Sequence, residues 1–213
     1  MTTKYDNPVD RLITAFDQGL KTLTGQYDAQ RPNPAAEMAD AEMTEAEKAH
    51  VTGLMRVNHT GEICAQALYE GQALSAKTEA ARTALLAAAE EERDHLAWCR
   101  DRLVELDSRP SVLDPLFYGV SYVMGAVTGM AGDRISMGFV EATEDQVVKH
   151  LDEHLEAMPE QDERSKAILE QMRADEARHG EAAIAHGGTE FPQPVKNAMT
   201  LVSKLMTTTT YRG

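Results

Sequence analysis

Two short segments of this chain repeat one pairing, a glutamate followed by a histidine three residues later. The first is AEEERDHLAWC at residues 89–99, with Glu92 and His95, and the second is RADEARHGEAA at residues 173–183, with Glu176 and His179. Residues three or four apart lie on the same face of an α-helix. Apolar residues recur at helical spacing through both segments, so each pair is predicted to lie on the buried face of a helix.

Two further helices are predicted to turn a glutamate inward. The apolar series through positions 51, 55, 58, 62, 65 and 69 includes Glu62, and the series through 137, 140, 144, 147 and 151 includes Glu144. A carboxylate in an apolar interior has to be protonated, paired or bound to a metal. No lysine or arginine occupies these series to neutralise four carboxylates. Four glutamates and two histidines from four helices are the ligand set of carboxylate-bridged di-iron or di-manganese bundles.

The order of these residues along the chain indicates a pair of ions. Glu62 precedes Glu92 by 30 residues and Glu144 precedes Glu176 by 32, so each half is a helical hairpin with one lone glutamate and one Glu-x-x-His pair. Oxygen-rich ligands with one imidazole for each ion favour iron, and less strongly manganese, over zinc. The predicted roles are bridging for Glu92 and Glu176, completion of one site for Glu62 and His95, and completion of the other for Glu144 and His179.

Three more residues are candidates for a supporting role beside the metals. His150 follows Glu144 by six residues and lies off the ideal apolar face, although a π-bulge would turn it inward. His59 lies one turn before Glu62, and Tyr69 lies two turns after it, with ordinary core packing as the alternative for the tyrosine. The other histidines outside the predicted ligand set, His50, His154 and His186, are expected at the surface or at helix boundaries.

The whole chain is predicted to be helical. Helices are expected over residues 8–24, 44–76, 79–106, 135–158, 160–185 and 195–206, and no stretch alternates with period two. Thr44 and Glu47 form a capping-box signal at the start of the second helix. Four long helices with accessory ones predict an all-α bundle.

Charge and cysteine content exclude several classes of protein. The net charge of −14 argues against a nucleic-acid partner, because a phosphate backbone requires a basic surface. Cys64 and Cys99 indicate a reducing compartment rather than a disulfide framework. Asp6, Asp10 and Arg11 interrupt any apolar segment near the N-terminus, so neither a signal peptide nor a transit peptide is expected.

Residues 115–132 read PLFYGVSYVMGAVTGMAG, without a charge. The length is sufficient for a membrane span, but Pro115 opens the run, four glycines interrupt it, and it joins two helices that must share one metal site. We therefore expect a buried or interfacial helix that rests on a membrane or lines a tunnel for an apolar substrate. A bundle helix or an oligomer contact is the alternative. The N-terminal helix and a C-terminal segment with Lys196, Lys204 and Arg212 are expected to add membrane contact.

These motifs together resemble the demethoxyubiquinone hydroxylases, which are ferritin-like di-iron monooxygenases of ubiquinone biosynthesis. The resemblance covers about residues 44–213 and leaves residues 1–43 outside. It is carried by RVNHTGE (56–62) with ALYEGQ after it, EERDHL (91–96), RPSVLDPLFYGVSYVMGAVTG (109–129), VEATEDQVVKHL (140–151) and ADEARHGEAA (174–183). All six predicted ligands fall on the family's motif positions, and His150 falls where the family has a histidine close to its site.

The resemblance implies a ferritin-like four-helix bundle with additional amphipathic or interfacial helices. It divides the chain into an N-terminal amphipathic helix and linker (1–43) and a di-iron hydroxylase domain (44–213). The implied reaction is O₂-dependent hydroxylation of 3-demethoxyubiquinol, a prenylated methoxy-quinol lipid, by an enzyme with two iron ions. The implied location is peripheral, on the cytoplasmic face of a bacterial cell membrane. A homo-oligomer or contacts with other ubiquinone-biosynthesis proteins are the partners to expect.

The electron donor and the activity have open alternatives. No Gly-x-Gly-x-x-Gly follows a strand, so no dinucleotide-binding fold is predicted. Electrons from NADH directly, through the quinone, or from a separate reductase all fit this pattern. The alternative functions are a ferritin-like ferroxidase, a radical-generating subunit with Tyr69 as the nearby tyrosine, and a non-catalytic membrane-associated quinone-binding protein.

Overall fold

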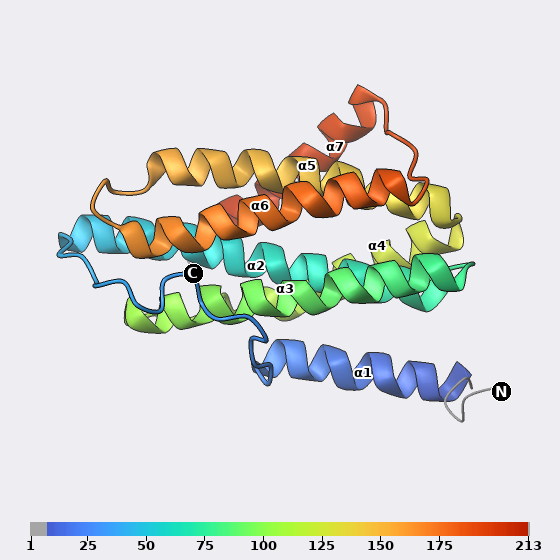
Figure 1. The fold of residues 1–213 in the computed structure, drawn as a ribbon, viewed down its shortest axis with the longest axis horizontal. Helices are drawn as coiled ribbons and strands as arrows, with labels where there is room; N and C mark the ends of the chain where they lie inside the picture. Colours follow the sequence, from blue (N-terminus) through green and yellow to red (C-terminus); the bar gives the residue numbers. More distant parts are fainter. Residues whose placement is uncertain (1–7, 213) are drawn as a thin grey trace.

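The computed structural model describes residues 8–212, and these residues form seven helices without a strand (Figure 1). The helices are α1 (Pro8–Thr24), α2 (Glu45–Ser75), α3 (Glu79–Glu105), α4 (Asp114–Met130), α5 (Asp133–Ala157), α6 (Glu163–Ala185) and α7 (Gln193–Thr210). The long helices α2, α3, α5 and α6 run along the longest axis of the molecule and form a ferritin-like bundle. The prediction of an all-α fold is confirmed.

Local signals set the helix ends. The Thr44 hydroxyl accepts from the backbone N–H of Glu47 while the Glu47 carboxylate accepts from the backbone N–H of Thr44, so the predicted capping box is present. The last helix is longer than the predicted range 195–206, because a proline is tolerated in the first turn and the hydroxyls of Thr208 and Thr210 bond back to backbone carbonyls four residues earlier.

The apolar core consists of separate clusters along the bundle. One cluster contains Trp98, Leu103, Leu151, Leu169 and Met172, together with residues of the first turns of α2. Another is built from later residues of α2 and α6 and from earlier residues of α3 and α5, among them Tyr69, Leu85, Met137, Val140 and Ala183. The predicted ligands lie between these two sets on every one of the four helices, so the apolar clusters close off a polar centre from both ends.

Glycines let α4 lie directly against α2. A Cβ atom at Gly125 would stand 2.2 Å from the carbonyl oxygen of Leu68, and one at Gly71 would stand 2.2 Å from the carbonyl oxygen of Tyr122. The opposite side of α4 exposes Leu116, Val120, Val123, Val127 and Met130. The uncharged run is therefore a helix with one face on the bundle and one face exposed.

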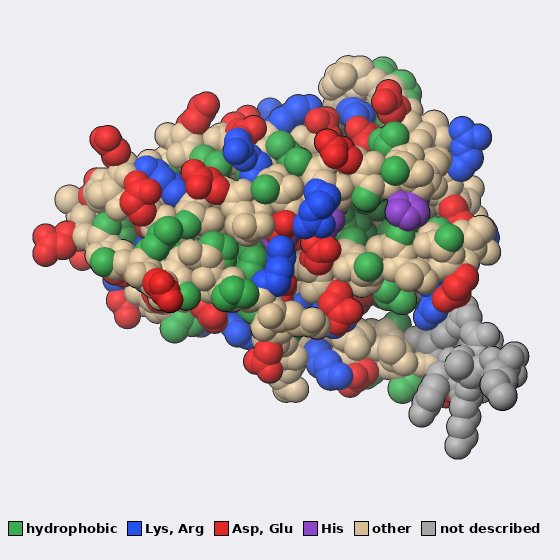
Figure 2. Space-filling view, in the orientation of Figure 1, with side chains coloured by type: hydrophobic (Ala, Val, Ile, Leu, Met, Phe, Trp, Pro, Cys, Tyr) green, Lys and Arg blue, Asp and Glu red, His purple; other side chains and the backbone are tan. Residues whose placement is uncertain are grey.

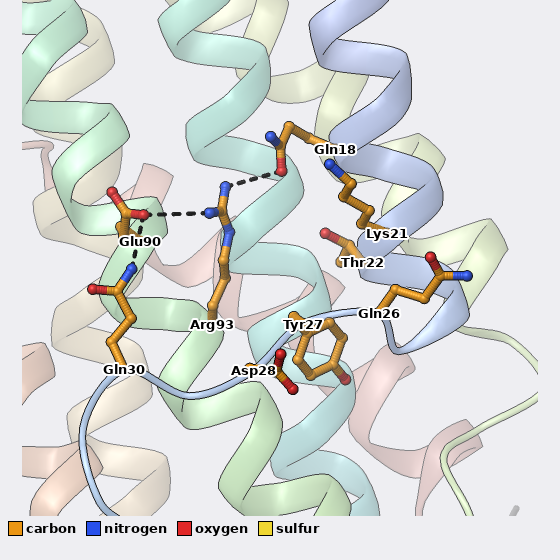
Figure 3. A pocket seen from close by; sticks show the side chains of 9 residues that line it. All are labelled: Gln18, Lys21, Thr22, Gln26, Tyr27, Asp28, Gln30, Glu90 and Arg93. Atoms are coloured by element: carbon orange, nitrogen blue, oxygen red, sulfur yellow. Dashed lines mark hydrogen bonds and ion pairs between the residues drawn. The ribbon is translucent and has the colours of Figure 1, made fainter.

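Residues 25–44, here called the N-terminal strap, connect α1 to α2 and cross the bundle. The strap is held to α3 where Gln30 donates to Glu90 over 3.1 Å, beside a polar cavity between α1 and α3 (Figure 3). Ala35 is buried in the apolar core, and the buried guanidinium of Arg102 donates to Asp40 over 3.0 Å. The strap thus packs on the long helices rather than standing apart from them.

Exposed apolar side chains also occur on the two terminal helices. These side chains include Ile13, Phe16 and Leu20 on α1 and Leu201, Val202 and Leu205 on α7. Both helices, like α4, pack against α2. By contrast, charged side chains of both signs are spread over the face that Figure 2 shows. No described helix is both long and apolar enough to cross a bilayer.

Candidate metal centre

The six predicted ligands meet in the middle of the bundle, and none is more than 6% exposed. Their potential ligand atoms form two groups, within each of which all atoms lie within 4.8 Å of one another. The groups are Glu62, Glu92, His95 and Glu176, and Glu92, Glu144, Glu176 and His179. Glu92 and Glu176 belong to both, so the geometry divides the residues into two shared glutamates and two separate Glu–His pairs.

Each histidine turns one ring nitrogen towards the shared glutamates. His95 Nδ1 lies 3.1 Å from Glu92 Oε2 and 3.0 Å from Glu176 Oε1. His179 Nδ1 lies 3.2 Å from Glu92 Oε1 and 3.3 Å from Glu176 Oε2. Both imidazoles therefore point Nδ1 into the cluster, as a metal-ligating histidine does when its other nitrogen donates to an outer group.

The outer nitrogens have carboxylate partners that the sequence patterns did not single out. His95 Nε2 lies 3.1 Å from Asp175 Oδ2, and His179 Nε2 lies 3.2 Å from Glu91 Oε2. Each partner directly precedes the shared glutamate of the opposite helix, Asp175 before Glu176 and Glu91 before Glu92. That repeated position is the signal in the sequence that would have revealed them.

The donor set fits divalent cations. Glu144 Oε2 is buried and has no hydrogen-bond donor among the described residues, while Glu92 Oε1 and Glu176 Oε1 are buried with an imidazole Nδ1 nearby. Carboxylate oxygens that are removed from water and lack a donor are poorly stabilised unless a cation binds them. Two imidazole nitrogens and four carboxylates match the ligand set of a carboxylate-bridged pair of ions.

The protonation of the cluster is uneven. Burial, with repulsion from neighbouring glutamates, raises the pKa of Glu62 and of Glu144 well above its usual value. Burial also disfavours the charge of Glu92, but hydrogen bonds from His179 and His95 prevail and hold its pKa below the usual range. Burial opposes protonation of His179, yet hydrogen bonds to Glu176 and Glu92 raise its pKa to about 11. Bound cations would compete with protons on both kinds of ligand.

Tyr69 is buried against the cluster and donates its hydroxyl to Glu144 Oε1. Burial, with repulsion from Glu144, raises the pKa of Tyr69 well above its usual value, so the phenol keeps its proton. Tyr69 also lines a cavity of about 610 Å³ between α3, α5 and α6. His179, Glu91 and Arg178 border the same cavity, and most of its remaining lining is alanine, leucine, methionine and valine.

The two histidines named as supporting candidates have partners outside the cluster. His59 Nε2 lies 3.3 Å from the hydroxyl of Tyr27, and His59 Nδ1 lies 3.3 Å from Asp114 Oδ2. The ring of His150 contacts that of His154 in a tilted arrangement with centroids 4.0 Å apart, and its Nδ1 lies 3.8 Å from Glu153 Oε2. The helix is regularly α-helical at this point, without the π-bulge that would turn His150 inward.

One prediction about surface residues was wrong. His154 is buried rather than at the surface, because Asn58 of α2 provides a hydrogen-bond partner for its Nδ1 at 2.8 Å. Lys196, which was expected to add membrane contact, donates to Glu141 of α5 over 2.9 Å. Lys204 is exposed.

Known proteins resemble this chain over nearly its whole length. Residues 49–210 match the family described as ubiquinone biosynthesis protein COQ7. The 3-demethoxyubiquinol 3-hydroxylase of Ectopseudomonas mendocina (strain ymp) is 58% identical over 207 residues, which cover 97% of this chain and 96% of that protein. The protein of the same name from Pseudomonas fluorescens (strain SBW25) is 56% identical over 214 residues, which cover 99% of each chain.

A third relative has similar coverage. The 3-demethoxyubiquinol 3-hydroxylase of Pseudomonas aeruginosa (strain LESB58) is 54% identical over 212 residues, or 98% of each chain. With coverage this high, the similarity reaches into residues 1–43, which the motifs in the sequence had left outside. The chain belongs to the COQ7 family of ubiquinone biosynthesis proteins.

Proposed function

We propose that this protein is a hydroxylase of ubiquinone biosynthesis that acts on 3-demethoxyubiquinol at a centre of two iron ions. The observation that carries the proposal is the pair of buried ligand groups that share Glu92 and Glu176. The names of the relatives supply the reaction: each is a 3-demethoxyubiquinol 3-hydroxylase. In this reaction one atom of O₂ enters the quinol ring and the other leaves as water, with two electrons from NADH or a reductase and two protons.

In this proposal each side chain of the cluster has a separate task. Glu92 and Glu176 would be shared by the two ions, Glu62 and His95 would hold one of them, and Glu144 and His179 would hold the other. Ions held by these residues would supply electrons to O₂ and stabilise negative charge on oxygen. Tyr69 orients Glu144 by donating to one of its oxygens, which leaves the other oxygen free to bind an ion. The apolar clusters on both sides of the centre exclude water.

We assign the quinol ring to the cavity beside His179. Its small apolar lining suits an aromatic ring and an isoprenoid chain, and its polar lining includes Glu91, Arg178 and His179. These polar groups can form hydrogen bonds with the oxygen substituents of a ring bound in the cavity. Replacing an alanine of the cavity lining with valine, leucine or isoleucine would reduce the volume available to the ring.

We further propose that the protein binds a membrane surface peripherally, through the exposed apolar side chains of α1, α4 and α7. All three helices pack against α2 and expose apolar residues, among them Phe16, Val123 and Leu201. A prenylated substrate resides in the bilayer, and an interfacial helix inserts its apolar face at the boundary between headgroups and acyl chains. For a bacterial protein this surface is the cytoplasmic face of the cell membrane.

The test of the reaction is turnover with isotope-labelled oxygen. Purified protein loaded with Fe(II) receives a short-chain 3-demethoxyubiquinol, a reductant and ¹⁸O₂, and the product is analysed by mass spectrometry. The proposal predicts a hydroxylated quinol that carries one ¹⁸O atom. Oxidation of iron without a hydroxylated product would favour a ferroxidase instead.

A further inference from the structure

We propose that Arg31 of the N-terminal strap is a positioning residue for the metal centre, acting through Asp175 on the ligand His95. This inference rests on the proposed metal-binding function and adds to it a residue from outside the four-helix bundle. Arg31 lies before residue 49, where the match to the family begins. None of the six ligands comes from this part of the chain.

The guanidinium of Arg31 joins the two helices that carry the shared glutamates. Its Nε donates to Asp94 Oδ2 on α3 over 2.6 Å, and its Nη1 donates to Asp175 Oδ2 on α6 over 2.8 Å. Asp175 Oδ2 is also the atom that lies 3.1 Å from His95 Nε2. One carboxylate oxygen therefore has both the strap arginine and the ligand histidine as partners, so the position of Arg31 bears directly on the orientation of the imidazole.

The strap holds Arg31 in place by contacts of its own. The backbone N–H of Gln30 donates to Asp94 Oδ1 over 2.6 Å, so Asp94 binds the backbone and the guanidinium of the strap together. The guanidinium also lies over the ring of Trp98, 5.0 Å from its centroid, and Trp98 is buried. The ring of Trp98 and the two carboxylates together fix the orientation of the planar guanidinium, and the carboxylates also balance its charge.

On the His179 side of the centre, no described residue of the N-terminal strap is bonded to the outer carboxylate, Glu91. His179 Nε2 faces Glu91, whose described basic partner besides His179 is Arg178. The Glu91 side chain is 36% exposed, whereas that of Asp175 is 5% exposed and has Arg178 as well as Arg31 as a partner. The two ion positions are therefore inequivalent, and loss of Arg31 should affect the position completed by Glu62 and His95.

The matched control is Arg164, which joins the same three parts of the molecule far from the ligands. Arg164 of α6 bonds to Glu105 of α3 over 2.5 Å and donates to the backbone carbonyl of Met38 in the strap. An Arg164→Ala change thus loosens the strap and the α3–α6 contact without touching His95 or its partners. Any effect of Arg31→Ala that Arg164→Ala does not share belongs to the metal centre.

The experiment is an anaerobic titration of the full chain with Co(II), followed by visible absorption, with thermal unfolding measured in parallel. We expect wild type to bind Co(II) in two steps, and Arg31→Ala to weaken one of them by about tenfold, the lower end of the effect of removing a direct outer partner of a metal ligand, because Arg31 acts on His95 through Asp175. Arg164→Ala is expected to lower the unfolding temperature and to keep both steps. Arg31→Lys should recover part of the loss, because it retains the charge but not the fork of donors.

The outcomes separate this inference from the proposal beneath it. Two unchanged steps in Arg31→Ala, or an equal loss of affinity in Arg164→Ala, overturn the positioning role while leaving the metal centre intact. A wild-type chain that binds no Co(II) overturns the metal centre itself, and the inference with it. If Arg31→Ala does not fold, Arg31→Gln removes the charge at the same position and carries the same expectation.

Discussion

Each histidine of the centre has an inner and an outer nitrogen with different partners. His95 and His179 direct Nδ1 to the shared glutamates, while Nε2 faces Asp175 and Glu91 respectively. An outer carboxylate fixes the tautomer that leaves the inner nitrogen free, and it raises the basicity of the ligand. At the scale of single residues, Asp175 and Glu91 therefore orient the two histidines for cation binding without being predicted ligands themselves.

The first prediction concerns protons at these residues. Burial raises the pKa of Glu62 and Glu144, and hydrogen bonds to carboxylates outweigh burial to raise the pKa of His95 well above its usual value and that of His179 to about 11. These shifts favour the protonated form of all four groups when no ion is bound, so a bound ion has to displace protons. Metal affinity should rise with pH, by about tenfold per pH unit for each proton released.

Calorimetric titration with Co(II) in buffers of different ionisation enthalpy counts the released protons directly. We expect net release at neutral pH and tighter binding at about pH 8 than at about pH 6. Substitution Glu62→Gln should reduce the number of protons released. An affinity that does not change with pH, with no proton release, would show that the ligands are already deprotonated.

At the scale of helices, α4 depends on glycine where it meets α2. Gly71 and Gly125 bring the two backbones together, since a Cβ atom at either position would stand 2.2 Å from a carbonyl oxygen of the other helix. Carbonyl oxygens within a helix cannot move aside as a flexible side chain can. The close approach fixes α4 along α2, and with it the direction in which α4 exposes its apolar side chains.

Two glycines of α4 provide a matched pair of substitutions. Gly125→Ala should lower the free energy of unfolding by about 1–3 kcal/mol, as overpacking does. A Cβ atom at Gly119 would meet no neighbouring described group within 4 Å. Gly119→Ala should therefore raise the free energy of unfolding by about 0.5–1 kcal/mol through helix propensity alone. Chemical denaturation measures both; equal effects in the two variants would contradict the close packing.

Helical periodicity explains why the sequence could predict which side chains of the long helices face the interior. The positions of Glu62 and Glu144 relative to apolar neighbours sufficed to place them in the interior, because a helix repeats every 3.6 residues. Periodicity says nothing about contacts such as that of Arg31 with Asp175, which are 144 residues apart in the chain. It also missed the burial of His154, which depends on Asn58 of another helix.

At the scale of the whole molecule, charge and apolar surface have different distributions. Acidic and basic side chains spread over the face in Figure 2, while α1, α4 and α7 expose apolar residues and pack on α2. In the view of Figure 1, α4 and α7 lie behind the long helices. This arrangement supports the proposal that the molecule approaches a bilayer with these helices.

Vesicle co-sedimentation tests that proposal with a matched pair of charges. Val123 on α4 is 62% exposed and Val104 on α3 is 63% exposed. Val123→Asp should reduce binding to phospholipid vesicles several-fold, because it places a charge in the interfacial face of α4. Val104→Asp adds the same charge elsewhere and should leave binding unchanged. Wild-type protein that stays wholly in the supernatant would remove the membrane proposal.

The most direct test of the central claim is the iron content of the protein after anaerobic loading with Fe(II) and removal of loosely bound metal. Because Glu92 and Glu176 belong to both ligand groups, wild type should retain two ions per chain and Glu176→Ala no more than one. Wild type that retains fewer than two ions, or Glu176→Ala that still retains two, would contradict a centre bridged by the shared glutamates.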